Sequence, residues 1–227
     1  ERNAIKEADH VITVSKETKE YLMRTYKADN ESITIVKNAT QLNPIDRPVH
    51  PANQRFTCSI ILPIDGFESN SMALKMLLSV AQETEKTDPE IRFVVIGGGD
   101  KPDPKSQNVY YTGFVPDLGA EILKSDVCLN TYPKDAVCGG TRNKVCDYLV
   151  LGQPIISTKE GMRGFDDCVP GEDYILANDV KSTVSKILEL KNNPDRLIKL
   201  RFKALTKGID YQWSKKAKEV LKVFDSL

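Results

Sequence analysis

Residues 56–81 read FTCSIILPIDGFESNSMALKMLLSVA, a pattern that predicts a buried strand followed by a helix. Phe56–Leu62 is a continuous apolar run, which is typical of a strand covered on both faces. From Ser71 to Ala81 the apolar residues recur at helical spacing. A strand of this kind that leads into a helix favours an α/β fold with a parallel sheet.

The same alternation of strand and helix continues to residue 190. It predicts a parallel sheet with right-handed helical crossovers and helices on both faces. The further strands are expected at 91–96, 109–112, 127–130, 154–158 and 173–176, and the further helices before 124 and at 179–190, 194–207 and 212–224.

The amino-terminal residues predict a short piece of another domain. They show a helix end at 4–8, a strand at 10–14, a helix at 15–26 and a strand at 33–36, too little to form a core alone. Residues 42–54 contain three prolines and no apolar periodicity, so they predict a linker. We therefore divide the chain into 1–41, the linker 42–54, a ligand-binding domain at 55–207 and a carboxy-terminal helix at 208–227.

Composition restricts the class of partner. Lys plus Arg number 32 and Asp plus Glu number 32, so no overall charge attracts nucleic acid. The sequence contains no apolar run of about 20 residues and no signal or transit peptide at its start, so we expect a cytoplasmic protein. The chain begins with Glu, and we expect an upstream portion to be missing. Five cysteines without zinc-like spacing predict reduced thiols and no metal site.

The loops that follow the predicted strands hold most of the glycines and special polar residues. In an open parallel sheet, ligands bind outside the carboxyl ends of the strands. This placement predicts a ligand of the nucleotide type. The loops are 63–70, 97–100, 113–117, 131–141 and 158–166.

Residues 139–154, GGTRNKVCDYLVLGQP, predict a loop that runs into a helix. Gly139 and Gly140 open a turn, and Thr141 can cap the helix. The helix start, together with Arg142 and Lys144, could hold a diphosphate, and Asp147 could reach a ribose hydroxyl. The alternative is an ordinary capped helix with surface charges.

The order of these segments resembles the carboxy-terminal, donor-binding half of glycosyltransferases with the GT-B fold, which has two facing Rossmann-like domains, and specifically family 4. The resemblance covers almost the whole chain. The segments that carry it are EADHVITVS with ITIVKNAT, FVVIGGG, YYTGFVPDL, DVCLNTYP and GGTRNKVCDYLVLGQPIISTKEGMRGF.

The resemblance implies transfer of a sugar from a nucleoside diphosphate sugar to an unknown acceptor, with retained configuration and without a metal or other cofactor. It implies that Asn70 belongs to the donor site, that Gly97 and Gly98 line the cleft, and that the backbone of Val115 and Pro116 contacts the base. Loop 139–142 would contact the diphosphate and the sugar.

Three departures from the family pattern bear on the site. The first Glu of the family's pair is Gly139 here, and the second is Asp147. Asp keeps the acceptor oxygens, so ribose binding survives the shorter side chain. The Lys-Gly pair after the first strand is also absent, so Arg142 or Lys144 would have to neutralise the phosphates. Catalytic residues cannot be assigned.

Three alternative functions remain open at this point, and one alternative role remains open for the last helix. A non-catalytic nucleotide-sugar-binding or scaffold module would explain the degenerate position at Gly139. A nucleotide-sugar epimerase uses the same twin-domain fold, and a nicotinamide-dependent dehydrogenase would show similar strands but a third glycine after Gly99.

The acceptor site is expected on the missing amino-terminal domain, so this chain alone would be inactive. Peripheral contact with the cytoplasmic face of a membrane is an alternative for the last helix, through Lys215, Lys216, Lys218 and Lys222.

Overall fold

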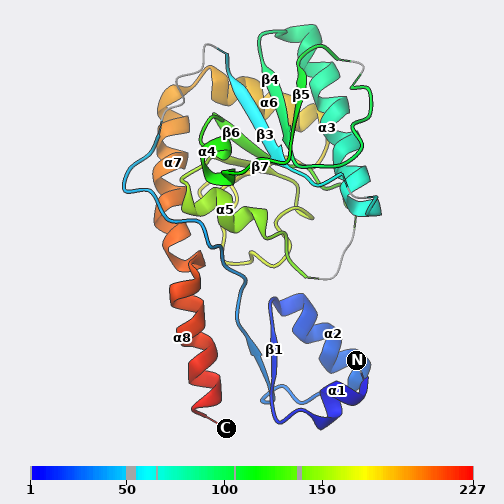
Figure 1. Cartoon of the computed structure of the whole chain (residues 1–227), viewed down its shortest axis with the longest axis vertical. Coiled ribbons are helices and arrows are strands. Elements are labelled where there is room, and N and C mark those ends of the chain that lie inside the picture. The colour runs from blue at the N-terminus through cyan, green and yellow to red at the C-terminus, as the bar shows by residue number, and fades with distance from the viewer. Residues whose placement is uncertain (1, 50–54, 65, 105, 137–139, 227) are drawn as a thin grey trace.

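A parallel sheet forms the larger part of the molecule (Figure 1). The computed structural model describes residues 2–49, 55–64, 66–104, 106–136 and 140–226, and within them this sheet has six strands in the order β5-β4-β3-β6-β7-β8. Every pair of neighbouring strands is parallel, which confirms the predicted fold class. The strands are β3 (Thr57–Ile61), β4 (Arg92–Ile96), β5 (Val109–Gly113), β6 (Val127–Asn130), β7 (Ile155–Ser157) and β8 (Ile175–Leu176).

Helices cover both faces of this sheet, and alternate residues of one strand show how. Along β6, Val127 and Leu129 pack in the same apolar cluster as α3 (Glu68–Thr87) and α6 (Val180–Lys191). Cys128 lies between them in sequence and packs on the opposite face. That face is covered by α4 (Leu118–Ile122), α5 (Lys144–Val150) and the 3₁₀ turn η1 (Ile209–Tyr211). The alternation is that of side chains on a strand buried on both faces.

Helix α7 (Pro194–Gly208) is anchored to the sheet by one buried cation. The guanidinium of Arg201 donates hydrogen bonds to the carbonyl oxygens of Ser125 and Asp126, at 3.2 and 3.1 Å. These carbonyls immediately precede β6, so α7 is held at the amino end of that strand. The opposite end, where the strand carboxyl ends gather, is left for the site.

The amino-terminal residues form a small unit of their own. Strands β1 (Val11–Thr13) and β2 (Ile33–Ile35) pair in parallel, and α1 (Arg2–Glu7) and α2 (Lys16–Tyr26) flank them. Ser15 caps α2 by accepting a hydrogen bond from the backbone N–H of Thr18 at 3.1 Å. In Figure 1 this unit lies below the six-stranded sheet.

The segment between the two units packs against the sheet domain. Leu42 and Ile45, in the first half of the predicted linker, pack against the apolar cluster that contains α5. Residues 50–54 lie outside the described residues. The division at 42–54 stays a prediction.

Helix α8 (Trp213–Phe224) begins beside the segment that leads out of the small unit. The backbone N–H of Thr40 donates to the carbonyl of Tyr211 at 2.9 Å, just before this helix. Lys216 is buried and donates to Glu219 at 2.7 Å, so this lysine is not available for the alternative of membrane contact. No helix among the described residues has the length and apolar content needed to cross a bilayer.

Candidate functional site

The site forms where the order of the strands reverses, between β3 and β6. These two strands pair only at Cys58↔Val127 and Ser59↔Cys128, so their carboxyl ends separate beyond Ser59. Two side chains of α5 bond to the backbone of Ile61 in the gap. The hydroxyl of Tyr148 accepts from the N–H of Ile61 at 2.8 Å, and the ammonium of Lys144 donates to its carbonyl oxygen. Such a reversal point is the usual ligand crevice of an open parallel sheet.

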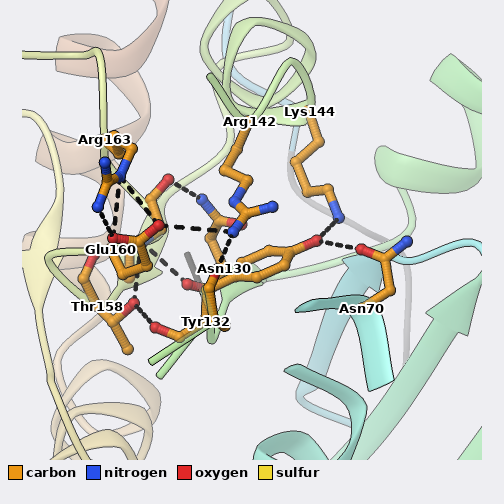
Figure 2. Close-up of polar contacts among 11 residues, drawn as sticks. Asn70, Asn130, Tyr132, Arg142, Lys144, Thr158, Glu160 and Arg163 are labelled. Atoms are coloured by element: carbon orange, nitrogen blue, oxygen red, sulfur yellow. Dashed lines mark hydrogen bonds and ion pairs between the residues drawn. The ribbon is translucent and has the colours of Figure 1, made fainter. Parts of the chain in front are cut away.

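Tyr132 lies at the centre of a group of polar side chains at this end of the sheet (Figure 2). Its hydroxyl donates to Oδ1 of Asn70 at 2.9 Å and accepts from the ammonium of Lys144 at 2.8 Å. Asn70 in turn donates to the carbonyl of Pro63 at 3.2 Å. The structure therefore brings Lys144 and the predicted Asn70 to the same point. Sequence analysis missed Tyr132, although its place two residues after a buried strand, in a loop at the carboxyl edge, was a usable signal.

Arg142 lies on the face of the Tyr132 ring, and its guanidinium is engaged by protein groups. Its Cζ is 3.7 Å from the ring centroid, and its Nη2 donates to the carbonyl of Ala136 at 2.6 Å. The same nitrogen is 3.6 Å from a carboxylate oxygen of Glu160, which also binds Arg163 at 2.7–3.0 Å. A role of Arg142 in holding a diphosphate stays a prediction.

The helix after the Gly-Gly turn begins later than expected. Helix α5 starts at Lys144, and its N-cap is Asn143, which makes no side-chain capping bond. The predicted cap at Thr141 is wrong, because its hydroxyl instead accepts from Nδ2 of Asn38 at 2.7 Å. Gly164 makes room for this arrangement: its φ is +82°, and a Cβ there would lie 2.2 Å from the methyl carbon of Thr141. Arg142 consequently precedes the helix and does not share a helical face with Lys144.

Asp147 points toward the segment that joins the two units. Its Oδ1 accepts a 2.5 Å hydrogen bond from the hydroxyl of Thr40. Burial raises the pKa of Asp147, while the hydrogen bond from Thr40 and the charge of Lys144 act in the opposite direction. Lys144 and Asp147 lie one turn apart on α5, so a cation and a carboxylate are presented by one element.

The remaining predicted site residues lie in loops at the same edge of the sheet. A Cβ at Gly97 would be 2.5 Å from the carbonyl oxygen of Leu62, so backbone packing against the loop after β3 requires glycine there. A Cβ at Gly98 would have only the backbone nitrogen of Phe114 near it, at 4.0 Å, and a Cβ at Gly140 would have no atom within 4 Å. Val115 and Pro116 follow β5. Val115 is half-buried and Pro116 is exposed. Gly139 lies outside the described residues.

The described cysteines carry no reactive thiol. Cys58, Cys128, Cys146 and Cys168 are free and buried, and burial raises the pKa of Cys128, Cys146 and Cys168 to about 12. Within the described ranges, no group of three His, Cys, Asp or Glu side chains is placed to hold a metal ion.

Comparison with known proteins identifies the family. Residues 59–193, more than half of the chain, match the family model described as glycosyl transferases group 1. The chain belongs to this family. No curated protein sequence matches the glycosyltransferase chain.

Solved structures confirm the GT-B fold of this glycosyltransferase chain. HepE from Anabaena in complex with UDP gives a TM-score of 0.78 at 11% identity, over 99% of this chain and 65% of that one. A TarM variant from S. aureus, in complex with fondaparinux, alpha-GlcNAc-glycerol and UDP, gives 0.76 at 16% identity, over 98% of this chain and 45% of that one. The pneumococcal O-GlcNAc transferase GtfA, in complex with UDP and GlcNAc, gives 0.73 at 14% identity, over 99% and 46%. The chain therefore spans about half to two thirds of these structures.

Proposed function

We propose that the chain is the donor-binding half of a glycosyltransferase that takes a sugar from a nucleoside diphosphate sugar. The observation that carries this proposal is the placement of Lys144 at the open carboxyl ends of β3 and β6, with Asp147 one turn further along α5. Membership of the glycosyltransferase family supports it. The UDP in the solved HepE, TarM and GtfA complexes supports a nucleotide as part of the donor.

Seven of the predicted donor-site residues have a role in this proposal. The ammonium of Lys144 faces the diphosphate, and the carboxylate of Asp147 accepts from a ribose hydroxyl. Asn70 contributes through Tyr132, which it shares with Lys144. The open side of Gly98 and the backbone of Val115 and Pro116 face the base. Gly140 leaves space beside the sugar and its phosphate.

The proposed reaction breaks the bond between the anomeric carbon and the diphosphate oxygen and forms a bond from that carbon to an acceptor oxygen. The acceptor hydroxyl loses its proton, and the nucleoside diphosphate leaves with the bonding electrons. Preorganised donors stabilise the charge that develops on the leaving group, so no metal ion is required. We propose that the configuration of the anomeric carbon is retained, as in the family that the sequence resembles.

The whole protein in this proposal has two domains that face each other. Residues 1–41 close the amino-terminal domain, 42–54 link the domains, 55–207 bind the donor, and 208–227 return toward the amino-terminal side. The acceptor binds mainly on the amino-terminal domain. Transfer assays therefore need the two-domain protein, while donor binding can be measured on this chain.

Calorimetric titration with UDP, GDP, ADP and their sugars tests the donor site. We expect one nucleotide to bind, and we expect Asp147→Ala to weaken it about tenfold or more, because a charge-assisted hydrogen bond contributes about 1.5–3 kcal/mol. The control is Asp29→Ala, which removes an exposed carboxylate from the turn before β2. Absence of binding across the panel, or equal affinities of the two variants, would contradict the assignment.

A second candidate is a non-catalytic nucleotide-sugar-binding or scaffold module. One observation favours it: Arg142, a predicted phosphate ligand, is buried and bonded to protein groups. This module would bind a nucleotide in the titration above, yet the two-domain protein would transfer no sugar to any acceptor. The enzyme would do both.

A further inference from the structure

A cavity of about 580 Å³ lies beside the proposed donor crevice. It opens between the first turn of α2, which contributes Glu17, and the loops that follow β6, β7 and β8. The described residues that line it are Glu17, Lys134, Thr158, Lys159, Glu160, Arg163 and Asn178. All but Glu17 come from the carboxyl edge of the sheet, the edge at which ligands of this fold bind.

The lining of this cavity is rich in cations and hydrogen-bond donors. Glu160, whose side chain is only 7% exposed, is held by Arg163 at 2.7 Å and faces Arg142 at 3.6 Å, so its charge is more than neutralised. Lys134 and Lys159 are exposed, and no carboxylate in the described part of the chain pairs with either. Glu17 is the single remaining carboxylate among the described lining residues.

Asn178 adds a neutral donor to these cations. Its Oδ1 accepts from the backbone N–H of Lys159 at 2.9 Å, which leaves its amide N–H₂ group to donate. A cavity with excess positive charge and several N–H donors favours an anion that has several acceptor oxygens. Phosphate and carboxylate groups have this chemistry.

A wall of side chains lies between the residues of this cavity and the residues proposed to bind the donor (Figure 2). Arg142 and the ring of Tyr132 form this wall, with Glu160 and Arg163 on the cavity side and Lys144 and Asn70 on the crevice side. The cavity and the proposed donor residues lie at the same edge of the sheet, so the proposal places one ligand at each. The second ligand would lie next to the bound donor.

We propose that this cavity is an anion site, separate from the nucleotide crevice, which takes the phosphate or carboxylate group of an acidic sugar. On the proposed function, that sugar is part of the acceptor, and the enzyme selects acidic acceptors. Lys134 and Lys159 provide the charge, and Asn178 provides a directed donor. Arg163, which is held by Glu160, adds a third cation to the lining.

Titration of the whole chain with glucose 6-phosphate, glucuronate and neutral glucose, followed by NMR, tests the site. We expect both acidic probes to bind at least about tenfold more tightly than glucose, and Lys134→Ala with Lys159→Ala to remove about tenfold of this affinity. The matched control is Lys75→Ala with Lys199→Ala, two exposed lysines on α3 and α7, which should leave affinity unchanged. Equal binding of acidic and neutral probes, or equal effects of the two double variants, overturns the proposal.

A second arm separates the cavity from the donor crevice. The acidic probes are titrated again after saturation with the nucleotide that binds in calorimetry. Retained affinity supports a separate site, whereas displacement by nucleotide shows that the probe's phosphate occupied the donor crevice and overturns the separation. If no nucleotide binds, the proposed function fails, and the lysine variants alone then decide whether the anion site exists.

Discussion

At the scale of single residues, the hydrogen bond from Thr40 to Asp147 favours the charged form of the proposed ribose ligand. Burial favours the protonated carboxyl and raises its pKa, while the Thr40 hydroxyl favours the carboxylate. The two residues are far apart in sequence and belong to the joining segment and to α5. A change in the joining segment can therefore alter the donor site without touching the ligand.

We predict that Thr40→Val raises the pKa of Asp147 further, because a hydrogen bond to the carboxylate is lost, and that it thereby weakens nucleotide binding at pH values near that pKa. Affinity falls as the pH drops toward the raised pKa and the carboxylate is protonated. In Thr40→Val this fall should occur at a higher pH than in the unmodified protein. Calorimetry across a pH series measures it.

Thr40→Ser is the matched control for this prediction, because it keeps the hydroxyl. It should leave the pH at which affinity falls close to that of the unmodified chain. A pH profile that is the same in Thr40→Val and Thr40→Ser would show that the hydroxyl does not set the charge of Asp147.

At the scale of elements, α5 completes the backbone bonding of β3 where β6 turns away. The hydroxyl of Tyr148 bonds the N–H of Ile61 and donates to the carbonyl of Leu129 at 3.4 Å, so it bridges the two strands. A buried N–H without a partner costs about 1–3 kcal/mol. The helix and the strand ends therefore depend on one another for stability.

We predict that Tyr148→Phe lowers the free energy of unfolding by about 1–3 kcal/mol, since Ile61 loses its partner in the gap. Tyr110→Phe is the control: it lies on β5 with a partly exposed ring, and should change stability by less than about 0.5 kcal/mol. Urea unfolding measures both. Similar losses in the two variants would show that the bond in the gap does not stabilise the fold.

The strands of the sheet could be predicted from the sequence because each is a local apolar run. Val127–Asn130 was predicted to the residue, and the other strands within one or two residues. The surroundings of Arg142 could not be predicted, because Tyr132 and Glu160 reach it from two separate loops. The start of α5 was misplaced for the same reason. The side chain of Asn38, far away in sequence, donates a hydrogen bond to the hydroxyl of Thr141.

At the scale of the whole molecule, a cluster of charges holds the small amino-terminal unit against the sheet domain. Lys37 donates to Asp166 and Asp167, at 2.5 Å each, and Asp167 also accepts from Tyr211 at 2.6 Å and pairs with Lys207 at 3.0 Å. Burial alone would raise the pKa of Asp167, but these donors hold it well below its ordinary value.

A carboxyl with a lowered pKa in the folded state contributes stability above its unfolded pKa and loses it as the pH falls through the folded value. We predict that Asp167→Asn lowers the free energy of unfolding by about 1–2 kcal/mol at neutral pH, less than a buried pair would, because the carboxylate is partly exposed. The difference from the unmodified chain should shrink below the ordinary pKa of Asp, about 4. Urea unfolding at several pH values measures it.

Asp166→Asn is the matched control, since Asp166 is more exposed and bonds only Lys37 among the described residues. Its loss should be about 0.5 kcal/mol. Equal losses for the neighbouring aspartates would show that Tyr211 and Lys207 add nothing to the cluster.

The gap between β3 and β6 has a consequence for the energetics of ligand capture. Lys144 is already fixed by the Ile61 carbonyl and the Tyr132 hydroxyl, so its flexible chain has lost its rotamer freedom during folding. Binding of a phosphate therefore does not have to immobilise the Lys144 side chain. Immobilising such a side chain on binding would otherwise cost about 0.5–1.5 kcal/mol. The phosphate becomes a further hydrogen-bond partner of an ammonium group that folding has already placed.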